Sequence, residues 1–293
     1  MLISDRLHEK TNFTNVEINI AEYLLENQDH IKNQSAHYIA NQLYTSPSMI
    51  TRFCQKIGYQ GFNDFKEAYL QEIAYLKSHF DTIDPNYPFK YNDKNIVVAN
   101  KIGSLYHEII DDTLVLLDHD SLQNAINALK QSQVIYLYSA GVQADLAKTF
   151  KDKMLKIGKN VVVETRMNEI FYRALFADKN DLFIIISYSG EVESLLRGVE
   201  KLKERNIPII AITSYGKNSL SKLASHVLYV ASKEKLVNNL GSFSMNLATL
   251  LLLDILYVNI FNDDFKSHQQ QKLTATKGFD LYRKSDNSLI EDD

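Results

Sequence analysis

The side chains best suited to contact another molecule lie in one short segment near the start of the chain, residues 45–62. Ser46 can cap the N-terminus of a helix there, Pro47 suits the first helical position, and Gly58 suits the left-handed residue after the end. At 100° per residue, one side of this helix is apolar and must pack on the rest of the protein. The opposite side carries hydroxyl, amide and cationic groups, which suit base edges and phosphates in a DNA major groove. This polar side consists of Ser48, Thr51, Arg52 and Gln55, with Lys56 at its edge.

Two further segments combine small residues with hydroxyl groups, and each follows a short apolar run typical of a strand. They are the first ligand loop, Ser139-Ala-Gly141-Val-Gln143, and the second ligand loop, Ser187-Tyr-Ser189-Gly190-Glu191. In a parallel sheet with the strand order 2-1-3-4-5, the two loops flank the switch point where ligands bind. Free backbone N–H groups at the helix starts that follow them favour an anion. The alternative is that the second loop only caps a helix.

Other kinds of chemistry have little support in the sequence. Arg166 follows the second expected strand, where it either reaches a bound anion or is only a solvated arginine. Residues 139–144 contain one glycine where a dinucleotide fingerprint needs three, and no nucleoside triphosphate loop is present. His226 and His268 lack metal-ligand spacing, and Ser189 lacks a nearby base. We therefore expect no cofactor, no metal and no enzymatic activity.

The elements that would position these groups divide the chain into two parts. Apolar residues at helical spacing dominate residues 1–77, which form either a helix-turn-helix domain or a generic helical bundle. Residues 78–100 are expected to be a linker, residues 101–270 a second domain, and residues 271–293 a C-terminal tail. In the second domain, helical patterns alternate with apolar runs, as in a doubly wound α/β sheet. The expected strands are 134–138, 161–163, 182–186, 208–212 and 227–230, and the expected helices lie near 101–118, 120–131, 142–157, 168–176, 191–206, 217–224 and 239–262.

The composition is that of an ordinary globular protein, with 293 residues, 45% hydrophobic and 23% charged. The net charge of −4 does not favour a nucleic-acid partner, and only the window 31–66 is basic. Cys54 is the single cysteine, which excludes a disulfide within the chain and fits a reducing cytoplasm. No signal-peptide pattern opens the chain, and polar residues interrupt the apolar stretch 247–261, so we expect a buried helix there and no membrane partner.

The segment Ile50-Thr-Arg-Phe-Cys-Gln-Lys-Ile-Gly-Tyr-Gln-Gly-Phe-Asn-Asp-Phe-Lys66 resembles the signature around the recognition helix of the RpiR family of bacterial transcriptional regulators. These proteins join an N-terminal helix-turn-helix domain to a C-terminal sugar isomerase (SIS) domain that senses a phosphorylated sugar. The likeness covers nearly the whole chain. It implies an α/β protein overall, in which an all-α helix-turn-helix domain precedes a five-stranded parallel sheet of flavodoxin-like order. It also implies that the five polar residues of the helix in 45–62 contact DNA.

The ligand loops depart from the pattern of this family, Gly-x-Gly-x-Ser and Ser-x-Ser-Gly-x-Thr. The corresponding residues are Ser139, Gly141 and Gln143 in the first loop, and Ser187, Ser189, Gly190 and Val192 in and after the second. Two hydroxyls that would hold a phosphate are therefore missing, at Gln143 and Val192. Each lost hydrogen bond to a charged group is worth about 1.5–3 kcal/mol. Phosphosugar binding is then weaker unless Gln143 or Arg166 compensates.

Together these observations predict a DNA-binding transcriptional regulator of sugar metabolism in the cytoplasm. We expect a homodimer or homotetramer that associates through helix 239–262 and binds a pseudo-palindromic double-stranded operator. Its small-molecule effector is expected to be a phosphosugar. Two alternatives are a SIS domain used only for oligomerisation and a sugar-phosphate isomerase, which the missing hydroxyls disfavour. The expected ligand-binding residues are Ser139, Gly141, Gln143, Arg166, Ser187, Ser189 and Gly190.

Overall fold

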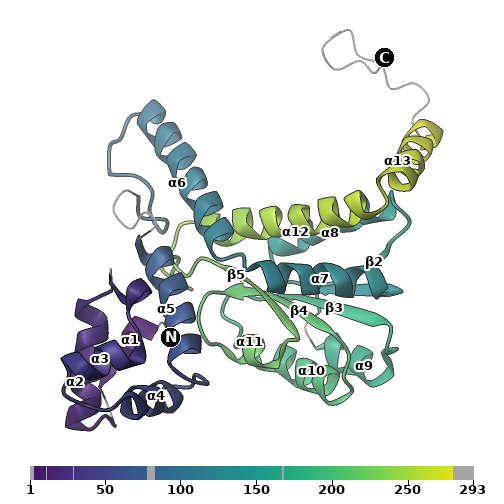
Figure 1. Ribbon diagram of the computed structural model, residues 1–293. Helices are drawn as coiled ribbons and strands as arrows, with labels where there is room; N and C mark the ends of the chain where they lie inside the picture. Colours follow the sequence, from purple (N-terminus) through teal and green to yellow (C-terminus); the bar gives the residue numbers. More distant parts are fainter. Residues whose placement is uncertain (1–2, 11, 29, 78–82, 167, 280–293) are drawn as a thin grey trace.

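The structure is a computed structural model that describes residues 3–10, 12–28, 30–77, 83–166 and 168–279 (Figure 1). Its first part, the helical domain, buries one apolar core that includes Leu24, Phe53 and Phe65. These residues recur at helical spacing, so each helix contributes one face to that core. The helices are α1 (Ile3–Glu9), α2 (Asn15–Glu26), the 3₁₀ helix η1 (Ile31–Asn33), α3 (Ala36–Gln42), α4 (Pro47–Lys56) and α5 (Phe62–Lys77).

The second part, the α/β domain, alternates helices and strands as the periodicity predicts. Its strands are β1 (Val134–Tyr138), β2 (Asn160–Glu164), β3 (Asp181–Ile186), β4 (Ile209–Ser214) and β5 (His226–Val230). Its helices are α6 (Asn95–Val115), α7 (His119–Gln131), α8 (Gln143–Leu155), α9 (Glu169–Phe176), α10 (Glu193–Glu204), α11 (Ser219–Leu223), α12 (Phe243–Asp263) and α13 (Phe265–Phe279).

The five strands form one parallel sheet in the order β2-β1-β3-β4-β5, which confirms the predicted flavodoxin-like order. Every residue of β3 is buried, as its unbroken apolar run predicts for a central strand. Residues of α6, α7, α8 and α12 form the core on one face of the sheet, and residues of α9, α10 and α11 cover the other (Figure 1). The carboxyl ends of β1 and β3 lie side by side, so the two ligand loops begin at the same edge.

Two segments differ from the expectation. Helix α6 begins at Asn95, within the expected linker, and α13 extends through residues 271–279 of the expected tail. Turn signals near Pro85 and Pro88 obscured the first boundary, and the polar sequence of α13 has no apolar face strong enough to reveal a helix. Residues 78–82 and 280–293 lie outside the described residues.

Helix α12 is long and apolar enough to cross a membrane by length and composition alone. In the structure its inner face lies in the core of the α/β domain, where Leu252, Leu253 and Leu256 are buried. Such burial is also what a core helix of a globular domain requires.

Candidate DNA-binding helix and ligand cavity

Helix α4 begins and ends where its sequence predicts. The Ser46 Oγ accepts a hydrogen bond from the Met49 N–H over 3.3 Å, and Pro47 occupies the first turn. Gly58 follows the helix with a φ of +95°, a conformation that favours glycine. Ile50, Phe53 and Cys54 are buried in the helical domain, and burial raises the pKa of the Cys54 thiol to about 12. The apolar side therefore fixes which side chains face solvent.

The middle of the polar side is open. Arg52 is exposed, and its guanidinium has no hydrogen-bond or ion-pair partner among the described residues. Thr51 and Ser48 lie nearby but bond locally: the Thr51 hydroxyl donates to the Pro47 carbonyl over 3.2 Å, and the Ser48 and Ser46 hydroxyls lie 2.9 Å apart. Arg52 is thus the cation on this side most available to an incoming phosphate or base.

The far end of the polar side is engaged within the domain. The Lys56 Nζ donates to the Asn12 carbonyl over 2.6 Å and pairs with the Glu17 carboxylate at 2.7 Å. Burial works to raise the pKa of Glu17, but hydrogen bonds from Lys56 and Thr14 outweigh it and hold that pKa below its ordinary value. The Gln55 amide donates to the Gln60 carbonyl over 3.1 Å. Both side chains would have to give up these partners to contact DNA.

Tyr44 is a residue that the sequence reasoning missed. It lies in the turn between α3 and α4 with a φ of +50°, and its side chain is 99% exposed. A residue other than glycine rarely has a positive φ, and tyrosine is enriched at surfaces that contact other molecules. The signal available in the sequence was its position directly before the capped helix.

A cavity of about 300 Å³, the ligand cavity, lies where the two ligand loops meet. Three of the residues predicted to bind a ligand, Gln143, Ser187 and Ser189, line it together with Ala140 and Tyr188. The remaining wall is apolar and comes from Ile186, Val192, Leu195, Leu236 and Met245. None of these described lining residues is charged, so the cavity offers hydroxyls, an amide and main-chain groups. That set can hold a polar, uncharged molecule or an anion at N–H groups.

Two predicted ligand residues lie beside the ligand cavity rather than on its wall. Ser139 is fully buried, and its hydroxyl has no hydrogen-bond partner among the described residues. A buried hydroxyl without a partner is costly, so it marks a place where a partner would stabilise the protein. Gly141 turns the chain with a φ of +62° before α8, which positions Gln143.

Arg166 and Gly190 have different surroundings. The Arg166 side chain is 77% exposed and pairs with Glu169 at 2.9 Å, and it does not line the ligand cavity. Gly190 is buried with a φ of +65°, and a Cβ built on it would lie 2.2 Å from the Asn218 Oδ1. Only glycine fits there, because Asn218 occupies the space.

Glu234 was also missed, because it lies in an irregular segment without periodicity. Its buried carboxylate accepts hydrogen bonds from the Ser244 and Met245 N–H groups at 2.9 and 3.1 Å, which caps α12. Burial raises the pKa of Glu234. The Tyr188 hydroxyl of the second ligand loop donates to the Glu234 carbonyl over 2.9 Å. This segment therefore closes one side of the ligand cavity.

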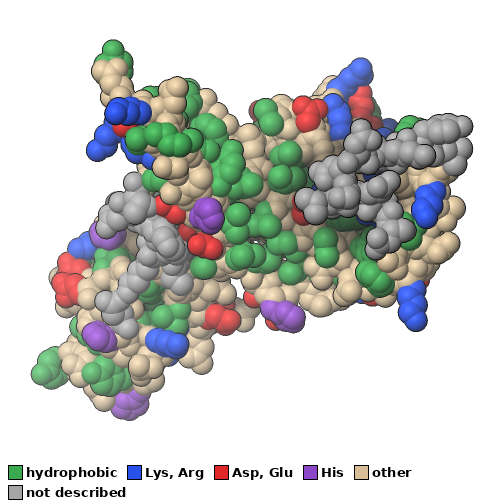
Figure 2. Space-filling model, turned by 90° about the horizontal axis from the view of Figure 1, so that it is seen from above, with side chains coloured by type: hydrophobic (Ala, Val, Ile, Leu, Met, Phe, Trp, Pro, Cys, Tyr) green, Lys and Arg blue, Asp and Glu red, His purple; other side chains and the backbone are tan. Residues whose placement is uncertain are grey.

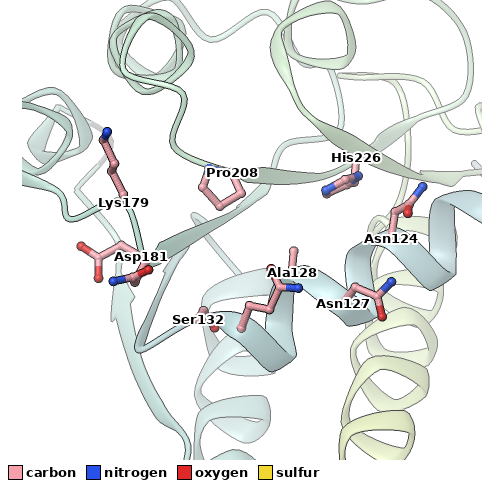
Figure 3. Close-up of a pocket in the computed structure, with 10 residues that line it drawn as sticks. Asn124, Asn127, Ala128, Ser132, Lys179, Asp181, Pro208 and His226 are labelled. Atoms are coloured by element: carbon pink, nitrogen blue, oxygen red, sulfur yellow. The ribbon is translucent and has the colours of Figure 1, made fainter.

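Another cavity of about 300 Å³ lies at the opposite edge of the sheet (Figure 3). Asn124 and Asn127 of α7 line it with Asp181 and His226, at the amino ends of β3 and β5. Burial lowers the pKa of His226, which favours the neutral ring. Ligands of doubly wound sheets bind at the carboxyl ends, so the ligand cavity is the better candidate. No cluster of three or more metal-ligating side chains occurs within the described part of the chain.

Comparison with known proteins agrees with this architecture. Residues 2–75 match the helix-turn-helix domain of the rpiR family, and residues 128–259 match the SIS domain. An uncharacterised HTH-type transcriptional regulator of Clostridium perfringens is 26% identical over 90% of this chain and 93% of its own. A second such regulator, from Caldanaerobacter subterraneus, is 29% identical over 85% of this chain and 86% of its own.

The fold is shared with solved structures. Vibrio vulnificus NanR complexed with ManNAc-6P superposes with a TM-score of 0.59 at 20% identity, over 96% of this chain and 99% of that one. The sugar isomerase domain of an RpiR transcription factor from Sphaerobacter thermophilus gives a TM-score of 0.54 at 16% identity, over 61% of this chain and 98% of that one. With both domains present in the family's order, the chain belongs to the rpiR family of helix-turn-helix transcriptional regulators that carry a C-terminal SIS domain.

Proposed function

We propose that this protein regulates transcription of sugar-metabolism genes by binding DNA through α4 and a phosphosugar in the ligand cavity. The observation that carries the proposal is the open Arg52 side of a capped helix, in the same chain as a hydroxyl-lined cavity at the switch point. The likeness to NanR, which was solved with ManNAc-6P, supports the ligand class. The ligand would change DNA affinity by favouring one domain arrangement over another.

In this proposal α4 is the recognition helix. Arg52 makes the main base or phosphate contact, and Ser48, Thr51 and Gln55 contribute hydrogen bonds. Lys56 contacts a phosphate only if it leaves Glu17. The exposed Tyr44 hydroxyl contacts the phosphate backbone beside the helix.

The ligand is held by the two ligand loops. Ser187 and Ser189 supply hydroxyls, Gln143 supplies an amide, and the turns at Gly141 and Gly190 present main-chain N–H groups. The Ser139 hydroxyl gains the partner that it otherwise lacks. Arg166 joins only if it gives up Glu169.

The active species is a homodimer or homotetramer. Apolar side chains gather on the surface over α12 (Figure 2), and Val258 of that helix is 58% exposed. Helix α6 adds exposed apolar residues, including Ile96 and Leu114. A second copy that covers these surfaces would set the spacing of two recognition helices, so the operator is pseudo-palindromic. The protein and its operator are in the cytoplasm.

The protein acts without catalysis. Isomerisation of a sugar phosphate needs a positioned acid or base, and the described walls of the ligand cavity carry no titratable side chain other than Tyr188. The nearby Glu234 carboxylate already accepts two backbone N–H groups of α12.

The test uses the full-length protein. DNA sites are first selected from a random library, and thermal-shift measurements with a panel of phosphosugars that includes ManNAc-6P identify ligands, because a ligand of the folded state raises Tm. The double variant Ser187→Ala/Ser189→Ala is expected to lose the Tm increase and keep DNA binding. Ser104→Ala, at an exposed serine on α6 that does not line the ligand cavity, is the control. An unchanged Tm response in the double variant refutes the proposed cavity.

A further inference from the structure

The α/β domain touches the helical domain at the C-terminal end of α4 (Figure 1). Lys217 lies in the loop between β4 and α11, and its Nζ is 4.9 Å from the centroid of the Tyr59 ring. A Cβ built on Gly58 would lie 3.0 Å from the same Nζ. A cavity of about 220 Å³ between the domains is lined by Tyr59 on one side and by Tyr215 and Tyr229 on the other.

The charges at this contact suit the end of a helix. The last carbonyls of α4 carry partial negative charge, which favours nearby cations. Arg6 of the helical domain donates to the Ile57 carbonyl, and Lys217 brings a second cation to the same end. Burial lowers the pKa of Lys217, and the positive charges of Arg6 and Lys222 lower it further. The Lys217 side chain is exposed, and its ammonium group lies where the end of α4 and the Tyr59 ring both favour a positive charge.

The loop that holds Lys217 and the start of α11 contact the second ligand loop directly. Leu220 N–H donates to the Gly190 carbonyl over 3.0 Å, and Ser219 N–H donates to the Glu191 Oε1 over 2.8 Å. Asn218 fills the space beside Gly190, and its amide donates to the Thr213 hydroxyl over 3.0 Å. Lys217 directly precedes Asn218 in the chain. One continuous segment, residues 215–220, therefore links the ligand loop to the end of α4.

We propose that Lys217 is a positioning residue that docks the helical domain in the ligand-free protein, and that residues 215–220 transmit ligand binding to α4. The inference rests on the proposed function, because it names the route by which the ligand cavity controls DNA affinity. A ligand that draws Ser189 and Gly190 toward itself also displaces Asn218. Gly190 and Asn218 are packed without room for a methyl group, and the Gly190 carbonyl is bonded to the Leu220 N–H. The displacement moves Lys217 away from Tyr59 and frees α4 to reorient.

The docking contact is tested first without ligand. Amide hydrogen exchange is measured by NMR at Gly58 and Tyr59, whose N–H groups donate to the Gln55 and Cys54 carbonyls. In full-length Lys217→Ala, exchange at these amides is expected to rise by about threefold to fivefold, the size of one lost cation–π contact. Lys179→Ala removes an exposed cation at the opposite edge of the sheet, away from the docking contact, and is expected to leave exchange unchanged. Equal exchange in the wild type and both variants overturns the docking role.

Transmission is also tested without ligand, by two glycine substitutions. Gly190→Ala places a methyl group against Asn218 and is expected to accelerate exchange at Gly58 and Tyr59. Gly158→Ala has the same left-handed strain after the end of α8, outside both ligand loops, and its methyl group meets only Gln271 at 3.8 Å, so exchange at Gly58 and Tyr59 stays at the wild-type rate. If Gly190→Ala does not fold, Asn218→Ser keeps a capping hydroxyl and serves the same comparison. If exchange at Gly58 and Tyr59 is at the wild-type rate in Gly190→Ala, or in Asn218→Ser where that variant replaces it, transmission through residues 215–220 is overturned.

The ligand arm uses ManNAc-6P and the phosphosugar panel as probes. In Lys217→Ala, a binding probe is expected to raise Tm as in the wild type but to change DNA affinity by less than about twofold, because docking no longer depends on the ligand. A full wild-type response in this variant contradicts the inference. If no probe raises the Tm of the wild type, the proposed ligand fails, while the two exchange experiments still decide the docking and the route.

Discussion

Gln143 and Asn246 tie the first ligand loop to α12, because the Gln143 Nε2 donates to the Asn246 Oδ1 over 2.8 Å. The Gln143 amide therefore serves the packing of the loop as well as the cavity wall, at the position where the pattern Gly-x-Gly-x-Ser places a serine. The cavity therefore has an amide in place of one hydroxyl that a phosphate site of this pattern would have.

Gln143→Ser restores a hydroxyl at this position. Phosphosugar binding is expected to tighten by about tenfold to a hundredfold, the range for one hydrogen bond to a charged group. Isothermal titration calorimetry with a phosphosugar identified by thermal shift measures the change. Gln131→Ser, at the end of α7 and away from the ligand cavity, provides the comparison. Weaker binding in Gln143→Ser would show that the amide itself contacts the ligand.

Arg52→Ala removes the free cation of α4. Operator affinity is expected to fall by about tenfold to a hundredfold, since a specific arginine contact contributes about 1–3 kcal/mol. Tm should stay within about 1 °C, because Arg52 is exposed and substitutions at such sites are nearly neutral. Fluorescence anisotropy with the selected DNA provides the measurement, and Lys32→Ala tests whether any exposed cation of the helical domain has the same effect. Wild-type affinity in Arg52→Ala would remove α4 from the DNA interface.

The Glu17–Lys56 pair is expected to make stability depend on pH. The pKa of Glu17 is lowered in the folded protein, so the pair stabilises the fold above the ordinary pKa of a glutamate, and this contribution is lost as pH falls through the lowered value. Glu17→Gln keeps the capping box with Thr14 but removes the charge. Its Tm should lie below that of the wild type at pH 7, and the difference should shrink as pH falls through the lowered pKa of Glu17. A Tm difference that persists at low pH would contradict the role of the ion pair.

Two helical glycines should respond to alanine with opposite signs. Alanine normally stabilises a helix by about 0.5–1 kcal/mol relative to glycine. Gly103 in α6 has nothing within 4 Å of a built Cβ, so Gly103→Ala should raise Tm. At Gly198 in α10 the same Cβ would lie 2.4 Å from Ile170 and 2.9 Å from the Phe171 backbone, so Gly198→Ala should lower Tm. Thermal unfolding of the two variants decides, and a rise in both would mean that α9 moves aside freely.

Most of the architecture could be predicted from short-range features of the sequence. Ser46, Pro47 and Gly58 act within a few residues of their positions, which is why the bounds of α4 follow from the sequence. The buried run of β3 and the strand order follow from periodicity and from the connection rules of parallel sheets.

Long-range pairing could not be foreseen in the same way. The Lys56 side chain meets Glu17, 39 residues earlier, and Lys217 meets Tyr59 in the other domain. Such contacts depend on how whole elements pack, and no local pattern encodes them. The roles of the predicted DNA-contacting and ligand-binding residues remain predictions, although Gln143, Ser187 and Ser189 do share one cavity.

The chain has one thiol, and it is sealed inside the helical core. With a pKa near 12, Cys54 stays protonated in the cell and reacts poorly with oxidants and alkylating reagents. Peroxide should therefore leave gene control by this regulator untouched. For the same reason, two cysteines engineered onto the surface, one in each domain, would be the only reactive sites for fluorescent dyes, so the distance between the domains could be measured without replacing Cys54.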